Sequence, residues 1–452
     1  MATPTATDPG SPEPAVRHPR ALDALNFLLA DVRGALGPFL NVFLVTERGW
    51  TQSAVGLMTT IAGLLGLLVQ TPIGGAIDAT PAKRGAVVAA LAVLALGAAT
   101  LFAAPFFWPV TVANAAMAVA GDVFGPAVAA LTLGLTTRAA LARRLGRSSA
   151  FDHAGNVAIA LAVGAVGYAV SQRAVFLLVP AFAVAAIATT LSIPHADIDQ
   201  RRARGLDDPD ADPGDAPARD TADASADAAP PAANPAAASG FRALLRSRPL
   251  MVFCLCAALF HFANAPLLPL VGQKLAAAHP RLADAMMASC IIAAQLVMLP
   301  VALLVGRTAD RLGRKPIFLA AFAILPLRAA LYTLSDNSAW LIGVQLLDGV
   351  GAGIFGALAP LIIADVTRGT GRFNLAQGFA ATCQGAGASL SGLAAGLLVD
   401  HAGYDTAFLS LGAAALVALV VFAVAMPETR DAGASGEQGR ALPEPAKGRE
   451  AL

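Results

Sequence analysis

Six ionisable side chains lie inside long apolar stretches of this chain, where charge is rare. They are Asp31, Arg33, Asp122, His261, Arg328 and Asp348, and the amide of Asn264 lies three residues after His261. The stretches that hold them have about 20 residues or more, enough for a helix to cross a bilayer. An ionisable group at the middle of a bilayer costs about 3 kcal/mol or more, so it usually faces a partner or a water-filled cavity. We therefore rank these seven residues first as candidates for proton exchange or for contact with a solute.

Asp31 and Arg33 are the first charged pair, in the run LLADVRGALGPFL. Two residues apart on a helix, they diverge by about 200°, so they cannot pair with one another on a single face. Gly34, Gly37 and Pro38 follow and loosen the helix, so freed backbone groups could line a cavity. The alternative is that the two charges make salt bridges to neighbouring helices.

Among the remaining residues, His261 and the two charges Arg328 and Asp348 have both a functional and a structural interpretation. A neutral histidine such as His261 exchanges a proton near physiological pH, but it could equally pack with a satisfied hydrogen bond. Arg328 and Asp348 could line a cavity with Asp122, or could pair with each other within the C-terminal half.

Composition separates this chain from soluble proteins. Its 452 residues are 56% hydrophobic and 13% charged, with a net charge of +1 and a mean hydropathy of +0.65. Soluble domains carry about twice that charged fraction. No basic face with interleaved aromatic residues exists, so a nucleic-acid partner is not expected. The four cysteines all lie in apolar segments, and we interpret them as small apolar side chains, not metal ligands.

The apolar pattern predicts an all-α membrane protein with twelve transmembrane helices. The segments are 21–46, 53–77, 85–104, 107–135, 149–171, 174–194, 249–273, 283–305, 316–335, 338–365, 373–399 and 403–426. No phosphate-binding loop of the type G-x-x-x-x-G-K-[ST] is present, so ATP-driven pumping by this chain is excluded, and we expect no cofactor. An enzyme is not expected, because no nucleophile or metal-ligand spacing accompanies the polar residues.

Basic residues predict the orientation. They gather in the first tail and in every second loop: Arg17, Arg20, Lys83, Arg84, Arg138, Arg143, Arg144, Arg147, Arg242, Arg246, Arg248, Gly306–Lys315, Arg368 and Arg372. The alternate loops hold only Arg48, Arg173, Lys274 and Arg281. Because cytoplasmic loops are enriched in Lys and Arg, both termini are expected in the cytoplasm.

Changes in composition along the chain predict its domains. We expect a disordered cytoplasmic tail over 1–20, a six-helix bundle over 21–194, a disordered acidic cytoplasmic linker over 195–248, a second six-helix bundle over 249–427 and a cytoplasmic tail over 428–452. The stretch from Ala203 to Ser239 within this linker is Asp, Ala and Pro with almost no large apolar side chain, so it cannot bury a core.

Two loops repeat one motif about 232 positions apart. The first reads Gly74, Asp78, Lys83 and Arg84, and the second reads Gly306, Asp310, Arg311, Gly313, Arg314 and Lys315. The second, G-x-x-x-D-R-x-G-R-K, resembles the signature loop of the major facilitator superfamily of transporters, and the first is a weaker copy without the Arg and Gly after its aspartate. The resemblance covers roughly residues 21–427.

The resemblance implies a fold and roles for these residues. Two pseudo-symmetric six-helix bundles would enclose a site near the midplane. The first, fourth, seventh and tenth helices would place Asp31, Arg33, Asp122, His261, Asn264 and Asp348 in one water-accessible space, where Asp31 and Asp122 are the first candidates for the proton carrier. The two loops would hold the cytoplasmic ends of the bundles together in the outward-open state and release them during the switch.

We therefore expect a secondary transporter in a bacterial-type inner membrane, with a small-molecule substrate, protons and the lipid bilayer as its partners, acting as a monomer. It would work by alternating access, with proton coupling and export of a drug or metabolite. A facilitative uniporter, a proton-coupled uptake symporter and a transporter-fold sensor are the alternatives. The fifth segment, GNVAIALAVGAVGY, lacks the Gly-Pro of many drug–proton antiporters, which weakens that assignment.

Overall fold

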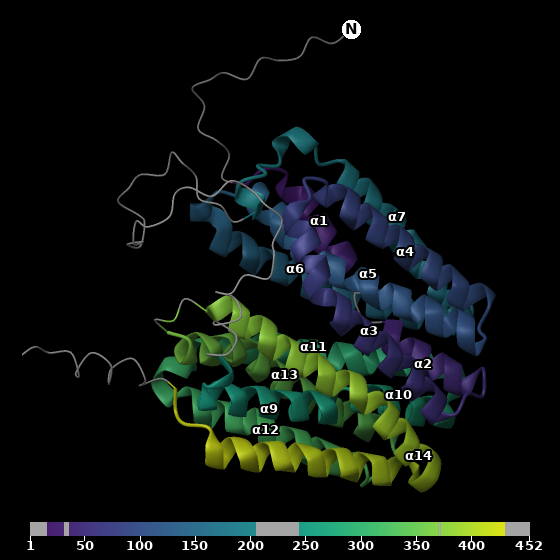
Figure 1. Cartoon of the computed structure of the whole chain (residues 1–452). Helices are drawn as coiled ribbons and strands as arrows, with labels where there is room; N and C mark the ends of the chain where they lie inside the picture. The colour runs from purple at the N-terminus through teal and green to yellow at the C-terminus, as the bar shows by residue number, and fades with distance from the viewer. Residues whose placement is uncertain (1–15, 31–35, 205–243, 369, 371, 430–452) are drawn as a thin grey trace, which may run out of the picture. The chain divides into compact units, whose positions relative to one another are not determined.

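The computed structural model describes residues 16–30, 36–204, 244–368, 370 and 372–429. This part of the chain is built of helices, and its only pairing of extended backbone is an isolated bridge between Val16 and Thr136 (Figure 1). In hydrocarbon every backbone polar group must find its partner within the protein, and a helix satisfies them all inside one segment. The long Ala-, Leu- and Val-rich stretches therefore fold as helices.

The chain divides into two compact units. The first comprises Met1–Arg48, Ile61–Asp227 and Arg281–Ala288, and the second comprises Gly49–Thr60, Ala228–Pro280 and Ser289–Leu452. Two long helices, α3 (Gln52–Ala79) and α11 (Ala283–Leu312), therefore each contribute one end to one unit and the rest to the other.

The first unit is a helical bundle in which α4 packs on α5 and α7, and α1 packs on α6. Its helices and turns are α1 (Pro19–Leu29), α2 (Leu36–Thr46), most of α3, α4 (Lys83–Ala103), α5 (Phe107–Gly134), α6 (Arg138–Ala169), η1 (Arg173–Leu177) and α7 (Leu178–Leu191). Small residues allow close approach, as where Gly97 of α4 faces the Met117 side chain of α5.

The second unit is organised around α14, which packs on α9 and α12. Its helices are α9 (Arg248–Asn264), α10 (Leu267–Ala278), most of α11, α12 (Arg314–Leu331), α13 (Ser338–Val366) and α14 (Phe373–Ala425). Phe318 and Phe322 of α12 stack on Phe422 of α14 with ring centroids 5.3 and 4.9 Å apart, and Phe318 also contacts Phe355 of α13. These aromatic contacts fix the registers of three helices in the core of the unit.

The beginning of α3 belongs to this second unit and is held by α14. The Asp400 carboxylate accepts hydrogen bonds from the backbone N–H groups of Gln52 (3.0 Å) and Ser53 (2.7 Å), and the Gln52 side chain donates to the Tyr404 hydroxyl (2.8 Å). The first N–H groups of a helix have no partner within it, so a carboxylate from another helix stabilises this end of α3.

Nine helices of the described residues are long and apolar enough to cross a membrane, against the twelve segments expected. Three places account for the difference. The expected segment 21–46 is divided between α1 and α2, and α12 carries three basic residues within 18. The last two expected segments run together as α14, which is interrupted only at Gly403, where φ is +82°. An L-residue rarely adopts that conformation, so glycine allows the break.

Described residues at the ends of the expected first tail and of the expected acidic linker contact one another and the first unit. Arg17 and His18 already make defined contacts with Asp197, through the carbonyl oxygen (3.2 Å) and the carboxylate (2.7 Å). Asp199 donates its backbone N–H to the Gly134 carbonyl at the end of α5 (3.0 Å). The ends of these two polar segments are therefore tied to the first unit, because backbone and charged groups find partners there. Residues 1–15 and 205–243 lie outside the described part.

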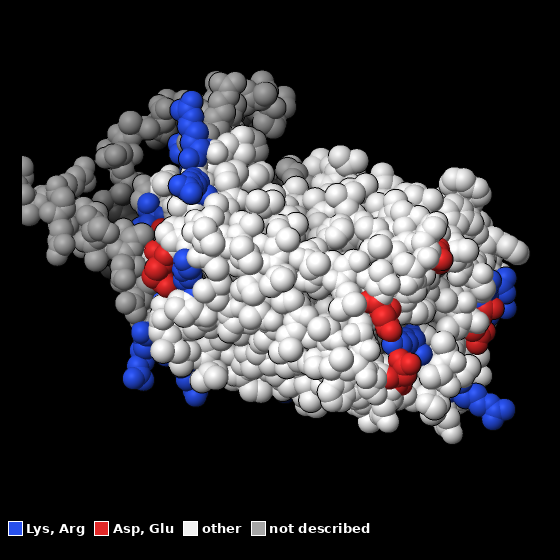
Figure 2. Space-filling view, turned by 90° about the horizontal axis from the view of Figure 1, so that it is seen from below, with Lys and Arg blue, Asp and Glu red and all other residues white. Residues whose placement is uncertain are grey.

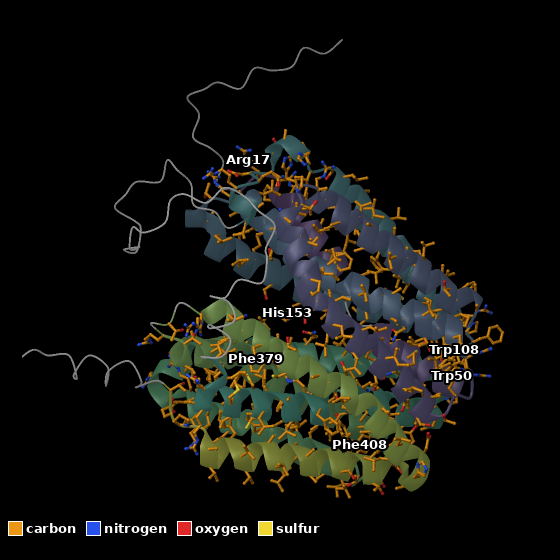
Figure 3. The ribbon with its side chains drawn as sticks, viewed as in Figure 1. Arg17, Trp50, Trp108, His153, Phe379 and Phe408 are labelled. Atoms are coloured by element: carbon orange, nitrogen blue, oxygen red, sulfur yellow. The ribbon has the colours of Figure 1, made fainter. Side chains whose placement is uncertain are left out.

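Charged side chains on the surface are separated from the apolar area. On the face shown in Figure 2, acidic and basic side chains gather toward two opposite sides, and a broad uncharged area lies between them. Figure 3 shows Trp108 at the beginning of α5, where its ring is exposed. Tryptophan is enriched where membrane helices reach the water interface.

Close packing of α9 on α14 can be tested at Gly387. A Cβ at this position would overlap the Ala258 carbonyl, whereas a Cβ at Gly378 of the same helix meets nothing within 4 Å. We expect Gly387→Ala to destabilise the protein by about 1–3 kcal/mol through overpacking. Gly378→Ala should be neutral or slightly stabilising, because alanine favours the helix.

Thermal unfolding in detergent measures both variants, with a thiol-reactive dye that reports exposure of the buried Cys254, Cys256 and Cys290. Equal melting temperatures for the two variants would show that the α9–α14 contact is not tight at Gly387.

Candidate solute, proton and locking sites

Asp122 is the predicted proton carrier that the structure describes. It lies near the middle of α5, is partly exposed, and makes no hydrogen bond or ion pair within the described part of the chain. Its Oδ2 would lie only 3.1 Å from a Cβ at Gly66, so glycine on α3 makes room for the carboxylate. Asp31 and Arg33, the other residues predicted for the N-terminal half, lie outside the described residues.

An apolar cavity of about 610 Å³ lies beside the same helices of the first unit. It is lined by residues of α3, α4 and α5, among them Leu65, Val69, Ala90, Val93, Val119 and Val123, and no polar side chain contributes to it. A cavity of this size and lining accepts an apolar group and offers a polar one no hydrogen-bond partner.

Arg328 and Asp348 are brought together in the second unit. Arg328 of α12 donates from Nη1 to Asp348 of α13, so the two residues form the ion pair that the sequence left as one of two alternatives. The Gln345 amide donates to the other Asp348 oxygen (3.0 Å), and its own carbonyl oxygen accepts from the Tyr332 hydroxyl. Tyr332 packs in turn on the ring of Phe408, with centroids 5.2 Å apart.

The guanidinium of Arg328 is deeply buried, with 2% of the side chain exposed. Its Nε and Nη2 have no hydrogen-bond partner among the described residues. Such donors are rare in folded proteins. The pair therefore leaves two charged donors available to any acceptor that reaches them, while Asp348 balances the charge.

His261 and Asn264 lie on α9, and the contacts of the His261 ring within the described residues are with Ala257, Phe260 and Phe355, not with this ion pair. The Nδ1 of His261 lies 2.9 Å from the Ala257 carbonyl oxygen, which only accepts, so Nδ1 carries the proton and Nε2 is left as an acceptor. The ring packs against Phe355 with centroids 4.8 Å apart. The Asn264 Oδ1 is buried without a partner in the described residues. His261 thus has the packed, hydrogen-bonded environment that was its alternative interpretation, and its role in proton exchange stays a prediction.

The second motif loop has a defined geometry between α11 and α12. Gly313 has φ +89°, and a Cβ there would lie 2.7 Å from the Glu428 carboxylate. Glu428 accepts hydrogen bonds from the backbone N–H groups of Arg314 (2.9 Å) and Lys315 (3.0 Å), which are the first of α12. The loop needs glycine because its backbone is left-handed and the carboxylate approaches so closely.

Arg314 ties this loop to α13. Its Nε donates to Asp365 (3.2 Å) and its Nη1 to the Ala309 carbonyl oxygen (3.0 Å). Thr429 donates to the same Asp365 oxygen (3.3 Å), and the exposed Arg368 pairs with the other oxygen (3.4 Å). One buried carboxylate therefore joins the ends of α12, α13 and α14.

The first motif loop makes a simpler contact. Lys83 is buried and donates to the Thr80 carbonyl oxygen (3.0 Å), and Arg84 donates to the carbonyl oxygen of Leu191 at the end of α7 (2.9 Å). The two loops are therefore alike in one respect. Arg84, at the start of α4, is bonded to the end of α7, and Arg314, at the start of α12, is bonded to Glu428 just after α14. The bonded groups differ, because the first acceptor is a backbone carbonyl and the second is a carboxylate.

The remaining residues of the two loops are two glycines, one arginine and two aspartates. Gly74 and Gly306 have open space where a Cβ would be, and Arg311 is exposed. Asp78 and Asp310 lie on α3 and α11, but their side chains are outside the described part. The proposed locking role of both aspartates therefore stays a prediction.

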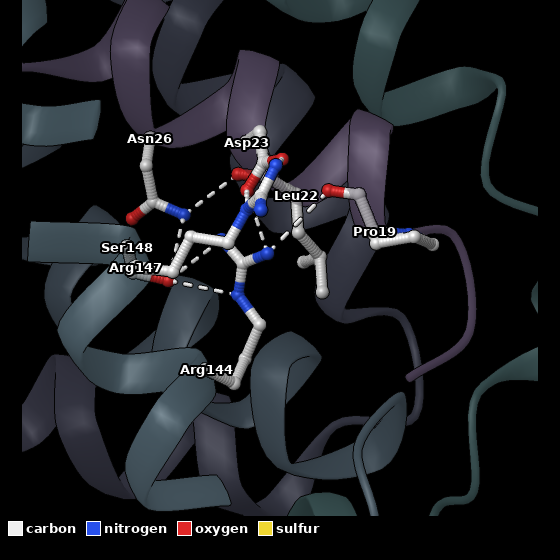
Figure 4. Close-up of polar contacts among 7 residues, drawn as sticks. All are labelled: Pro19, Leu22, Asp23, Asn26, Arg144, Arg147 and Ser148. Atoms are coloured by element: carbon white, nitrogen blue, oxygen red, sulfur yellow. Dashed lines mark hydrogen bonds and ion pairs between the residues drawn. The ribbon is translucent and has the colours of Figure 1, made fainter. Parts of the chain in front are cut away.

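Sequence reasoning missed the charged cluster that joins α1 to α6 in the first unit. Asp23, near the start of α1, accepts from Arg147 (2.7 Å) and pairs with the buried Arg144 (2.6 Å), and Arg144 also donates to the Ser148 hydroxyl (3.0 Å; Figure 4). The signal was present: an aspartate at the start of an apolar segment has to be paired, and Arg144 and Arg147 share one helix face at i and i+3. Asp365 and Glu428 were missed in the same way.

Comparison with known proteins identifies the class. The family model described as Major Facilitator Superfamily matches residues 22–325 and 255–451. Two uncharacterized MFS-type transporters of Mycobacterium tuberculosis, from strains CDC 1551 and H37Rv, are each 47% identical over 418 residues, which covers 92% of this chain and 94% of the relative. The tetracenomycin C resistance and export protein of Streptomyces glaucescens is 32% identical over 160 residues, 34% of this chain and 28% of that protein.

Solved structures share the fold at low identity. A single-residue mutant of the nucleoside transporter NupG superimposes with a TM-score of 0.72 at 13% identity, over 90% of this chain and 100% of that one. A D-xylose–proton symporter gives a TM-score of 0.65 at 12% identity, over 91% and 97%.

The protein is therefore an integral membrane transporter for a small molecule. It belongs to the major facilitator superfamily, as the motif loops predicted. That is a class of transporters, not of enzymes.

The buried pair of Arg328 and Asp348 yields a stability prediction. Asp348→Asn should lower the free energy of unfolding by about 3–5 kcal/mol, because it leaves the buried guanidinium without a counter-charge. Adding Arg328→Met to the same chain should recover a large part of that loss. Melting temperatures of the single and double variants in detergent measure this, and a double variant no more stable than Asp348→Asn would contradict the buried pair.

The carboxylate that joins the three helix ends yields a second prediction. Asp365→Asn should destabilise the protein by about 3 kcal/mol, because Arg314 is nearly buried. Arg368→Ala removes the other cation of the same carboxylate, but that side chain is 63% exposed and should cost under about 1 kcal/mol. The same unfolding assay compares them, and equal losses would show that burial does not distinguish the two pairs.

Proposed function

We propose that this protein is a proton-coupled secondary transporter of the bacterial inner membrane that exports a small organic solute by alternating access. Twelve transmembrane helices in two six-helix bundles, with both termini cytoplasmic, form the frame of this proposal. Asp122, a carboxyl at mid-length in α5 without a partner in the described residues, is the observation that carries it.

The physical reason lies in the cost of the two protonation states. A neutral carboxylic acid is cheap to hold among apolar helices, whereas an ionised one needs water, a cation or a solute. Asp122 has no arginine or lysine that would keep it permanently ionised within the described residues. It is therefore suited to gain a proton in one state of the transport cycle and to release it in another, with Asp31 as the second candidate.

Arg328 is the proposed solute-binding partner from the second unit. Its two unpartnered donors suit a carboxylate or another planar acceptor group. With Asp348 beside it, Arg328 favours a zwitterionic or amphoteric solute. The alternative is that the ion pair of Arg328 and Asp348 only stabilises the fold and binds no solute.

Export is favoured by one relative. The partial likeness to a tetracenomycin C resistance and export protein supports outward movement of an organic compound. A proton-coupled uptake symporter and a facilitative uniporter remain the rival functions, and the solved D-xylose–proton symporter is similar in fold alone.

The motif loops are proposed to lock one end of the transporter. Arg84 and Arg314 secure the helices that follow each loop, which leaves Asp78 and Asp310 at the helix ends as the groups that would engage and release. Individual ion pairs at a wet edge are worth about 1 kcal/mol or less, so such contacts can break during a transport cycle.

The proposal predicts loss of coupling in Asp122→Asn. In proteoliposomes with a trapped pH dye, addition of a transported solute should move protons with the wild type and not with the variant, because the amide cannot exchange one. Pooled metabolites and antimicrobial compounds serve as solutes, and Asp31→Asn is assayed in parallel. Whichever of the two variants no longer moves protons should still exchange solute across the membrane without net flux.

Asp336→Asn is the matched control, because this carboxylate is 82% exposed and lies in a surface pair with Lys274. It should move protons as the wild type does. Solute flux without any pH change, unaffected by either mid-helix variant, would overturn the proton mechanism and leave the uniporter. The sign of the pH change distinguishes export from uptake.

A further inference from the structure

Asp284 is a buried carboxyl that the transport proposal does not use. It lies in the first turn of α11, just after the short turn η5 (Pro280–Leu282), in the part of α11 that belongs to the first unit. This turn packs against the last turns of α6, at the end opposite the arginines of that helix. Only 4% of Asp284 is exposed.

Two glycines of α6 form the seat for this turn. A Cβ at Gly167 would overlap the Asp284 carboxyl and would lie 2.5 Å from its Cβ. At Gly164 an added Cβ would lie 3.1 Å from the Ala288 Cβ, one turn further along α11. The carboxyl therefore sits directly on the glycine face of α6, where any larger residue would exclude it.

The seat offers the carboxyl no counter-charge. Its Oδ2 is buried and has no hydrogen-bond partner among the described residues. The last fourteen residues of α6, from Asn156 to Ala169, contain no acidic or basic side chain. Glu47, which follows α2, is close enough for its charge to act on Asp284, and it is a like charge.

The basic residues next along the chain after α6 and before α11 point elsewhere or are exposed. Arg173 donates to the Phe102 carbonyl oxygen (2.6 Å) and stacks over the Phe102 ring, while Arg281 is exposed. An ionised carboxylate without a partner is expensive to bury, and a neutral acid is not. The packed contact is thus compatible with the protonated side chain and opposes the ionised one.

We propose that Asp284 is a proton-binding site whose protonation closes the contact between α6 and the start of α11, and whose ionisation opens it. The ligand is the proton alone, so this site depends on neither the solute nor Asp122. Lower pH then favours the closed contact. By linkage, the ratio of closed to open molecules changes by up to about tenfold per pH unit over the range in which the two forms bind the proton differently.

Distance measurements between spin labels test this in the full-length protein in lipid nanodiscs. Val170→Cys, at the end of α6, and Leu282→Cys, in η5, replace exposed side chains on the two elements. The four native cysteines are replaced by alanine. We expect one short distance at about pH 5 and a growing longer distance as the pH is raised by several units, with the ratio following the linkage limit.

Asp284→Asn should abolish this response and retain the short distance at every pH, because the amide fits the seat and does not ionise. Gly167→Ala should favour the longer distance at every pH, because its methyl group occupies the seat. Asp336→Asn, which removes the exposed carboxylate, should respond to pH as the unmodified labelled protein does.

Two outcomes would overturn the proposal: a distance distribution that does not change with pH in the labelled protein, or an unchanged pH response in Asp284→Asn. Either result would leave the proton-flux test of Asp122 unaffected, because the measurement contains no solute and no proton gradient.

Discussion

The cost of an uncompensated charge among apolar helices is the constraint on which the rest of this structure depends. Where a charge is permanent, the fold supplies a partner: Asp348 for Arg328, and Asp365 for Arg314. Where the charge can be removed by a proton, as at Asp122 and Asp284, the described residues supply none. The distinction separates charged groups that hold helices together from carboxyl groups that have no counter-charge.

Glycine gives this constraint its geometry. Between membrane helices the hydrophobic effect contributes little, so association relies on close packing, and glycine allows the closest approach. At Gly387 it permits α14 to contact the α9 backbone, whereas at Gly66 and Gly167 it leaves room for a carboxyl. The same residue type therefore builds rigid interfaces in one place and seats for ionisable groups in another. The side chains and backbone around each glycine decide which of the two it forms.

Helix ends are the second place where polar groups determine the architecture. The first N–H groups of a helix need acceptors, and here carboxylates distant in sequence provide them: Glu428 for α12 and Asp400 for α3. Basic residues at the first turns of α4 and α12 are likewise bonded to the ends of α7 and the segment after α14. In each half, the start of the helix after the motif loop is thus joined to the end of the last helix. The groups that form the bond differ between the halves, and a repeat in the sequence does not reveal this.

The sequence by itself determined the membrane class, the helical fold and the family, because long apolar runs and a loop of fixed spacing are local properties of the chain. It also identified Arg328 and Asp348 as buried charges, since any ionisable residue inside an apolar run stands out. Only the tertiary structure decided that these two pair, and that Asp284 rests on the glycines of α6. Partner choice depends on contacts between different helices, 20 residues apart for Arg328 and Asp348 and more than a hundred for Asp284 and Gly167, and no local pattern encodes which helix faces meet.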